Sequence, residues 1–141
     1  MKIYLAGPLF TTGERIFNRE LAGSLSESGY DIFLPQKECG GLNDPEDIFW
    51  KCCEGLHWAD IVVAVLEGSD ADSGTAWETG YAFGKGVPVI GVRTDFRLQG
   101  DDRGLNLMLS RSCTVLIERS SLEDSSPAEI AADIARHIKK L

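Results

Sequence analysis

The chain has 141 residues, of which 43% are hydrophobic, and this size and composition are typical of one domain with a single core. Asp and Glu number 22 against 14 Lys and Arg, and the formal charge of -8 disfavours binding to a nucleic-acid polymer because the basic residues do not cluster. No stretch approaches the ~20 apolar residues that span a bilayer, and residues 1–10 lack a signal-peptide pattern. We expect one cytoplasmic domain over residues 1–141 that binds no membrane.

The four cysteines do not form a metal-binding pattern. Cys39, Cys52, Cys53 and Cys113 occur without CxxC spacing, and the chain has only two histidines. Zinc sites typically show ligand pairs at short spacing, so reduced thiols without metal are the simpler interpretation. No glycine-rich loop that would cradle phosphates is present either. We therefore expect no metal and no organic cofactor.

Five short apolar runs alternate with amphipathic stretches along the chain. The runs, each predicted as a strand, are KIYLAG (2–7), YDIFLP (30–35), IVVAVL (61–66), PVIGV (88–92) and CTVLI (113–117). Alternation of strands with helices predicts parallel strands with helices on both faces of the sheet. The sequence thus indicates a Rossmann-like α/β fold.

Three helices are predicted from spacing and capping signals. Residues 13–28 carry apolar side chains at helical spacing and end before Gly29. In residues 44–60, Asp44 is the expected N-cap and Pro45 the first helical residue. The apolar face of this second helix is expected to hold Ile48, Phe49, Cys52 and Leu56. Residues 127–141 form the closing helix.

The loops that follow the strands are the expected place for chemistry, because ligands of such sheets bind beyond the carboxyl ends of the strands. These loops are AGPLFTTG (6–13), PQKECGG (35–41), EGSDADSGT (67–75) and RTDFRLQGDDRGLNLM (93–108). Acidic groups dominate the third loop. Asp72 in this loop and Glu78, three residues after the loop ends, are therefore the first candidates for a catalytic site.

Glu78 has two interpretations. Thr75 and Glu78 fit the T-x-x-E capping box, in which the glutamate only stabilises a helix start. Alternatively, a carboxylate in the first helical turn is kept ionised by the helix dipole, which suits a nucleophile. Asp72 adds a second carboxyl group that can handle a proton. Retaining glycosyl transfer uses such a pair of carboxyl groups, one as the nucleophile and one as the acid. The spacing alone leaves both interpretations of Glu78 open.

Three ordered segments resemble the nucleoside 2-deoxyribosyltransferase family. IYLAGPLF is similar to the family's opening strand with its tyrosine, DADSGTAWETGYA to its catalytic D-x-G-T-x-x-E-x-G-Y-A segment, and GLNLML to its N-L-M motif. The resemblance covers nearly the whole chain. It implies a flavodoxin-like parallel sheet of five strands, in agreement with the alternation of strands and helices.

Three catalytic roles are implied by the resemblance. Glu78 would attack C1′ of the deoxyribose, Asp72 would bind the base and shuttle its proton, and Tyr4 would hold the carboxylate of Glu78. The implied reaction moves 2-deoxyribose between nucleobases through a covalent glutamyl intermediate, with retention at C1′, slow hydrolysis and no cofactor. On the residues alone, Tyr4 also fits ordinary packing in a strand.

Further residues are implied in substrate binding. Gln36 would contact the base, while Asn106 and Met108 would reach the active site of a neighbouring subunit in a homodimer or larger homo-oligomer. The other expected substrate-binding residues are Gly7, Phe10, Ser73 and Gly74. Met108 also fits a core position, and Phe10 a contact at a helix start. The chain departs from the family pattern at Cys52, where an Asp or Asn that holds the base is expected.

Two rival functions remain at this point. A 2′-deoxynucleoside 5′-monophosphate N-glycosidase would use the same fold and glutamate, but Asp72 stands where such relatives carry a serine that grips the phosphate, and its charge would repel a phosphate dianion. A noncatalytic nucleoside or nucleotide sensor would have no need of both carboxylates. We expect a salvage enzyme that acts on free nucleosides and nucleobases, with the choice between purines and pyrimidines left open.

Overall fold

The computed structural model describes residues 1–95, 104–119 and 125–141. Its strands are β1 (Lys2–Ala6), β2 (Asp31–Phe33), β3 (Ile61–Val65), β4 (Val89–Arg93) and β5 (Val115–Glu118). They form one sheet in the order β2-β1-β3-β4-β5, and every neighbouring pair is parallel. This is the flavodoxin-like strand order, in which the chain reverses direction across the sheet between β1 and β3. The predicted α/β fold is confirmed.

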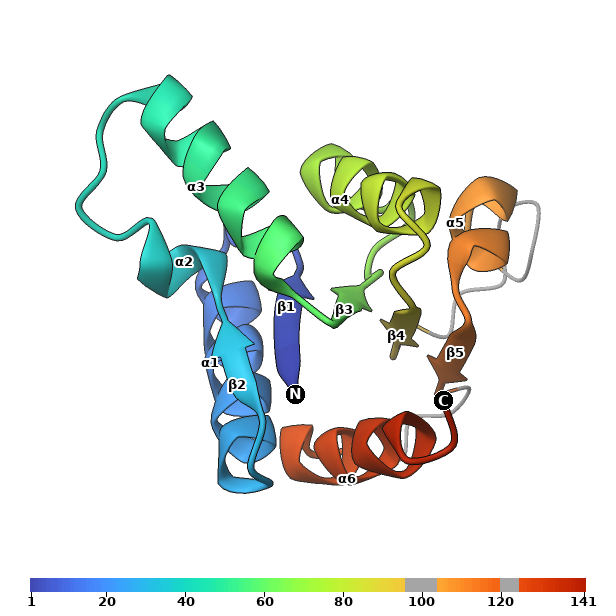
Figure 1. The fold of residues 1–141 in the computed structure, drawn as a ribbon. Helices are drawn as coiled ribbons and strands as arrows, with labels where there is room; N and C mark the ends of the chain where they lie inside the picture. Colours follow the sequence, from blue (N-terminus) through green and yellow to red (C-terminus); the bar gives the residue numbers. More distant parts are fainter. Residues whose placement is uncertain (96–103, 120–124) are drawn as a thin grey trace.

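Helices cover both faces of the sheet (Figure 1). One face carries α1 (Thr12–Glu27) and α6 (Pro127–Ile138), while the other carries α3 (Pro45–Trp58), α4 (Ser73–Gly84) and α5 (Leu107–Ser112). Side chains of β1 alternate between two separate cores: Ile3 and Leu5 pack with α1 and α6, whereas Tyr4 packs on the opposite side. The pleat of β1 therefore directs Tyr4 toward α3 and α4.

The capping signals explain most helix starts. Thr11 and Ser126 each form a capping box with the glutamate three residues later, and Asp44 accepts a hydrogen bond from the Glu46 amide as the predicted N-cap of α3. Two short helices, α2 (Pro35–Glu38) and α5, were not predicted because each lies in a segment read as a loop. Among the described residues, no helix is long and apolar enough to cross a membrane.

The buried face of α3 differs from the prediction. Cys53, Gly55 and Leu56 are buried, whereas Phe49 is 46% exposed and Cys52 lies partly exposed. Gly55 explains the shift, because a Cβ atom at this position would lie 2.7 Å from ring atoms of Phe33. Helix α3 therefore packs against Phe33 of β2 at Gly55, where no side chain stands in the way.

We predict that Gly55→Ala lowers the free energy of unfolding by about 1–3 kcal/mol, the usual cost of overpacking a core. The ring of Phe33 stacks on Tyr4 and has to move to admit the new methyl group. Gly23→Ala is the control, because no atom lies within 4 Å of its Cβ position on α1 and alanine favours helix. Urea unfolding measures both; equal stability of the two variants would contradict the close contact.

Candidate active site

A hydrogen bond between Tyr4 and Glu78 forms the centre of the site. The Tyr4 hydroxyl donates to Oε1 of Glu78 at 2.5 Å, joining β1 to α4 across 74 positions of sequence. The Tyr4 side chain is fully buried and stacks on Phe33, with ring centroids 5.2 Å apart and an interplanar angle of 12°. Its position is therefore fixed by the core. One carboxylate oxygen of Glu78 is held in place, and Oε2 is left for a ligand.

Burial changes the acidity of this pair. It raises the pKa of Glu78 from 4.5 to about 7, while the hydrogen bond from Tyr4 opposes the rise and the charge of Asp72 adds to it. Burial together with the Glu78 carboxylate also raises the pKa of Tyr4 well above its ordinary value. Tyr4 thus stays a hydrogen-bond donor at any physiological pH. Glu78 changes between its neutral and ionised forms near neutral pH.

The capping-box interpretation of Glu78 is wrong. Helix α4 begins at Ser73, and its N-cap is Asp72, whose Oδ2 accepts hydrogen bonds from the Thr75 amide at 2.9 Å and the Thr75 hydroxyl at 3.1 Å. Glu78 therefore lies in the second turn, and no acidic residue occupies the first. The proposed effect of the helix dipole on Glu78 is wrong for the same reason, since the dipole acts within the first turn. Burial governs its ionisation instead.

Asp72 is placed by the start of α4. Only its Oδ2 is hydrogen-bonded within the part of the chain that the structure describes, which leaves Oδ1 as the atom able to exchange a proton with a ligand. Ser73 and Gly74 form the exposed first turn beside it, and a Cβ at Gly74 would approach Oδ2 of Asp72 to 3.2 Å. The absence of a side chain at Gly74 therefore leaves room around the carboxylate.

The loop after β1 contains the predicted residues Gly7 and Phe10. A Cβ at Gly7 would lie 3.1 Å from both Oδ1 of Asn18 and Cβ of Val65, so this glycine permits close packing between α1 and β3. Phe10 is 73% exposed at the far end of the loop. The Arg15 guanidinium donates to the carbonyl of Phe10 at 2.9 Å. The loop is anchored from α1, and its aromatic tip is free for a contact with a ligand.

Gln36 lies on α2, at the carboxyl end of β2. Its Nε2 donates to the Arg15 carbonyl at 2.9 Å, which ties α2 to α1. Its Oε1 is buried and has no hydrogen-bond partner among the described residues. A buried acceptor without a partner is costly in the free protein, so Gln36 has capacity for one more donor.

Asn106 and Met108 lie away from the Tyr4–Glu78 pair. Asn106 is the N-cap of α5, and its Oδ1 accepts from the Met108 amide at 2.9 Å. Met108 is 75% exposed, so the core reading of this residue is wrong. Both line a groove of about 420 Å³ whose other walls include Ala76 and Phe83 of α4. Neither Tyr4 nor Glu78 lines this groove, because α4 stands between α5 and the strands around Tyr4 (Figure 1).

Sequence reasoning missed Arg93, which is fully buried at the end of β4. Its guanidinium donates to the carbonyls of Leu66 at 2.7 Å, Gly68 at 3.0 Å and Gly104 at 2.9 Å. These contacts fix the loop that leads to Asp72 and the segment just before Asn106. The available signal was an arginine directly after the apolar run PVIGV, where the end of a buried strand leaves carbonyl groups in need of donors.

The geometry defines a carboxylate site at the carboxyl edge of a flavodoxin-like sheet. Within the described residues, no group of three or more His, Cys, Asp or Glu side chains could hold a metal ion. The chemistry on offer is therefore that of two carboxyl groups, one of which is held by a tyrosine. This is the class of enzyme site in which a carboxylate attacks or protonates a small organic substrate.

The chain belongs to the nucleoside 2-deoxyribosyltransferase family, whose model matches residues 3–109. Among curated proteins, none gives a significant match. The matched region contains Tyr4, Asp72, Glu78, Asn106 and Met108. The family supports an enzyme of the nucleoside deoxyribosyltransferase type.

Solved structures of the same fold agree with this assignment. A conserved protein from Enterococcus faecalis superposes with a TM-score of 0.76 at 26% identity, covering 97% of this chain and 98% of that one. A 2-deoxyribosyltransferase from Bacillus psychrosaccharolyticus gives 0.70 at 27% identity, with 85% and 88% covered. A CMP N-glycosidase from Clostridium botulinum gives 0.69 at 16% identity, with 97% and 99% covered, and shares the fold.

We predict that Tyr4→Phe raises the pKa of Glu78 above its wild-type value of about 7, because the lost hydrogen bond from Tyr4 is the interaction that lowers it. At pH 7 the variant would then carry less ionised Glu78 than the wild type. Carbon NMR of the labelled glutamate carboxyl groups, assigned with Glu78→Gln, measures both titrations. A lower pKa in Tyr4→Phe would contradict the hydrogen bond.

Proposed function

We propose that this protein transfers 2-deoxyribose from one nucleobase to another through an ester between C1′ and Glu78. The supporting observation is the Tyr4–Glu78 hydrogen bond, which presents the carboxylate with one oxygen fixed and the other free. The pKa of about 7 keeps a large part of Glu78 ionised at neutral pH, as a nucleophile requires. Membership of the family indicates nucleosides and nucleobases as the substrates.

In the first half-reaction, Oε2 of Glu78 attacks C1′ from the face opposite the base. The bond between C1′ and the base nitrogen breaks, and its electron pair leaves with the base. Oδ1 of Asp72 delivers a proton to that base, so that negative charge does not build up on the leaving group. The Tyr4 hydroxyl keeps Oε1 in place while Oε2 becomes the ester oxygen.

The second half-reaction reverses these steps with a different base. Asp72 takes a proton from the incoming base, whose nitrogen attacks C1′ and releases the Glu78 carboxylate. Two displacements at one carbon restore its original configuration, as in retaining glycoside transfer. Water can replace the base as the acceptor, which gives slow hydrolysis. No step in this sequence requires a metal or an organic cofactor.

The base is expected to bind between Asp72 and Gln36. The buried Oε1 of Gln36 lacks a donor, and an exocyclic amino group of a nucleobase supplies one. The sugar would lie over the first turn of α4 at Ser73 and Gly74 and beneath the loop at Gly7 and Phe10. Free nucleosides fit this arrangement better than nucleotides, because Asp72 would repel a phosphate dianion. Such substrates point to a role in cytoplasmic nucleotide salvage.

The assay that tests this function is incubation with deoxyinosine and free adenine, followed by chromatography. We predict that deoxyadenosine appears, and that Glu78→Gln remains folded but loses transfer and hydrolysis together because one carboxylate serves both. Thr79→Ser is a control on the same helix that keeps the hydroxyl bonded to the Thr75 carbonyl.

The other products would exclude the proposal. Hypoxanthine without deoxyadenosine would indicate an N-glycosidase, and an unchanged mixture would indicate a sensor. Transfer that persists in folded Glu78→Gln would exclude Glu78 as the nucleophile.

We further propose a homodimer or larger homo-oligomer in which Asn106 and Met108 complete the site of a neighbouring subunit. The support is that Asn106 and Met108 line a groove that Glu78 does not line, and that Met108 is exposed beside it. Trp77 on α4 is 48% exposed, and its ring stacks on that of Tyr81 with centroids 5.3 Å apart. Exposed apolar side chains on α4 and α5 favour a partner over open solvent.

Subunit mixing tests the shared site. We predict that Glu78→Ala and Asn106→Ala, each inactive alone, recover about a quarter of wild-type activity after they are unfolded and refolded together. Half of randomly formed dimers are mixed, and one of the two sites in each mixed dimer is intact. Two preparations of Glu78→Ala refolded together serve as the control. No recovery in proven mixed dimers would place Asn106 in the site of its own chain.

A further inference from the structure

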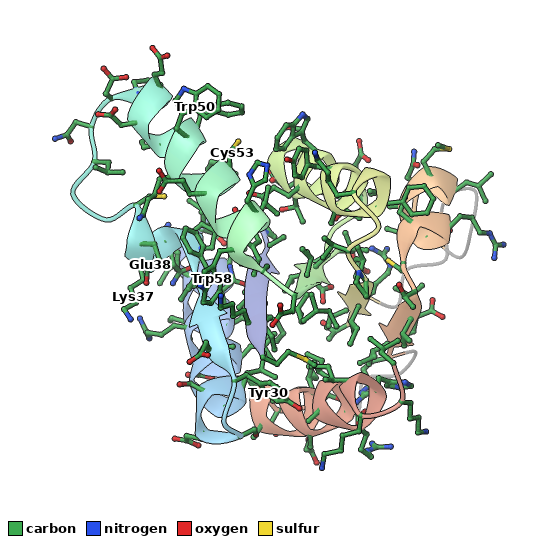
Figure 2. The ribbon with its side chains drawn as sticks, in the orientation of Figure 1. Tyr30, Lys37, Glu38, Trp50, Cys53 and Trp58 are labelled. Atoms are coloured by element: carbon green, nitrogen blue, oxygen red, sulfur yellow. The ribbon has the colours of Figure 1, made fainter. Side chains whose placement is uncertain are left out.

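Two thiols face each other beside the Tyr4–Glu78 pair. Cys39 ends α2 and Cys52 lies in the middle of α3, and their Sγ atoms are 3.8 Å apart. Figure 2 labels their sequence neighbours Glu38 and Cys53 on the same two helices. Both Cys39 and Cys52 are free thiols and partly exposed. The segment 40–51, which includes the first half of α3, therefore begins and ends next to two facing sulfur atoms.

Cys52 is also a neighbour of Tyr4. Its side chain lies close enough to the Tyr4 hydroxyl to contribute to the raised pKa of that hydroxyl, after burial and Glu78. Tyr4 in turn donates to Glu78 at 2.5 Å. A short chain of contacts therefore runs from Cys39 through Cys52 and Tyr4 to the carboxylate of Glu78.

A groove lies next to the two helices that carry the thiols. This groove of about 350 Å³ opens between α2, α3 and the edge strand β2, and it is lined by Glu38 and Lys51, which adjoin the two cysteines in sequence. The side chains of Phe33 and Trp58 form its apolar wall. The two thiols are themselves partly exposed, and this exposure gives a small disulfide access to them.

We propose that Cys39 and Cys52 are a modification site that forms a reversible disulfide with a low-molecular-weight disulfide, such as oxidised glutathione, as the oxidant. The disulfide disturbs the position of Tyr4 and thereby lowers turnover by Glu78. This effect on turnover rests on the function proposed above. The cross-link itself does not depend on that function.

The exchange is balanced in two displacements. The thiolate of one cysteine attacks a sulfur of oxidised glutathione, forming a mixed disulfide and releasing one glutathione thiolate. The second cysteine, after losing its proton, attacks the protein sulfur of that mixed disulfide and releases the second glutathione. The protein loses two protons and two electrons, and one oxidised glutathione takes them up to become two reduced molecules.

Closure of the disulfide moves atoms in the site. The distance between the sulfur atoms has to fall from 3.8 Å to about 2.05 Å, the length of a disulfide bond. Part of that movement displaces the Cys52 side chain beside Tyr4, and oxidation also removes the thiol hydrogen of Cys52. Displacements of about 1 Å in catalytic groups reduce rates by up to about 10²-fold. The loss of activity is expected within that range.

The reduced form is protected at neutral pH. Burial and the neighbouring Cys52 raise the pKa of the Cys39 thiol to about 12, with Lys51 opposing and Glu38 adding to the shift. The thiolate is the reacting form, so cross-linking is expected to accelerate as the pH rises.

The experiment treats the reduced protein with oxidised glutathione and follows intact mass, peptide mapping and transfer activity together. We predict loss of the mass of two hydrogen atoms, a linked peptide that contains Cys39 and Cys52, and a fall in activity of at least about tenfold that dithiothreitol reverses. Cys39→Ser is expected to keep its activity and to lose sensitivity to the oxidant. Cys113→Ser retains both thiols of the pair and is expected to behave as the wild type.

Several outcomes separate this inference from the proposed function. An alkylatable pair that does not cross-link, or a cross-linked protein with full activity, would overturn the inference while leaving the transferase assignment intact. If the reduced protein shows no transfer at all, the proposed function fails. The carboxyl carbon resonance of Glu78 then tests the inference without an activity assay. The inference requires this resonance to shift on oxidation of the wild type and to stay unchanged in Cys39→Ser.

Discussion

The hydrogen bond from Tyr4 to Glu78 is the interaction on which the rest of the site depends. It connects β1 with α4, and it exists because parallel strands bring β1 and β3 side by side while α4 follows β3 over the same face. The pleat of β1 aims Tyr4 at that face, and stacking on Phe33 holds the ring in place. The sheet topology and the core packing therefore together determine where the Tyr4 hydroxyl and Oε1 of Glu78 lie.

Burial sets the pKa of Glu78, and a different carboxylate, that of Asp72, caps the start of α4. Asp72 caps α4, so Glu78 is free of any capping role and can lie a turn further along, against Tyr4. Burial alone would favour the neutral acid, and the Tyr4 hydroxyl offsets part of that effect to leave a pKa of about 7. A nucleophile that is partly ionised at neutral pH is also a workable leaving group when the ester is resolved.

The sequence predicted the fold better than the site, for physical reasons. Alternating apolar runs report the burial of whole strands, and Asp44 with Pro45 marks a helix start through local hydrogen bonds. The start of α4 was misplaced because Asp72 and Thr75 are both suitable N-cap residues three positions apart, and only the backbone geometry decides between them. The role of Arg93 depends on three carbonyls from two separate segments, which no local pattern reveals.

Arg93 also shows how the two halves of the candidate site are mechanically joined. Its guanidinium binds carbonyls at the end of β3, four residues before Asp72 at the nearest, and the carbonyl of Gly104, two residues before Asn106. A displacement of either segment would break hydrogen bonds to a fully buried charge, which is costly. The loop that leads to Asp72 and the segment that leads to Asn106 are therefore coupled through Arg93. If Asn106 serves a neighbouring subunit, this buried arginine fixes the spacing between one chain's own site and the contribution it makes to the next.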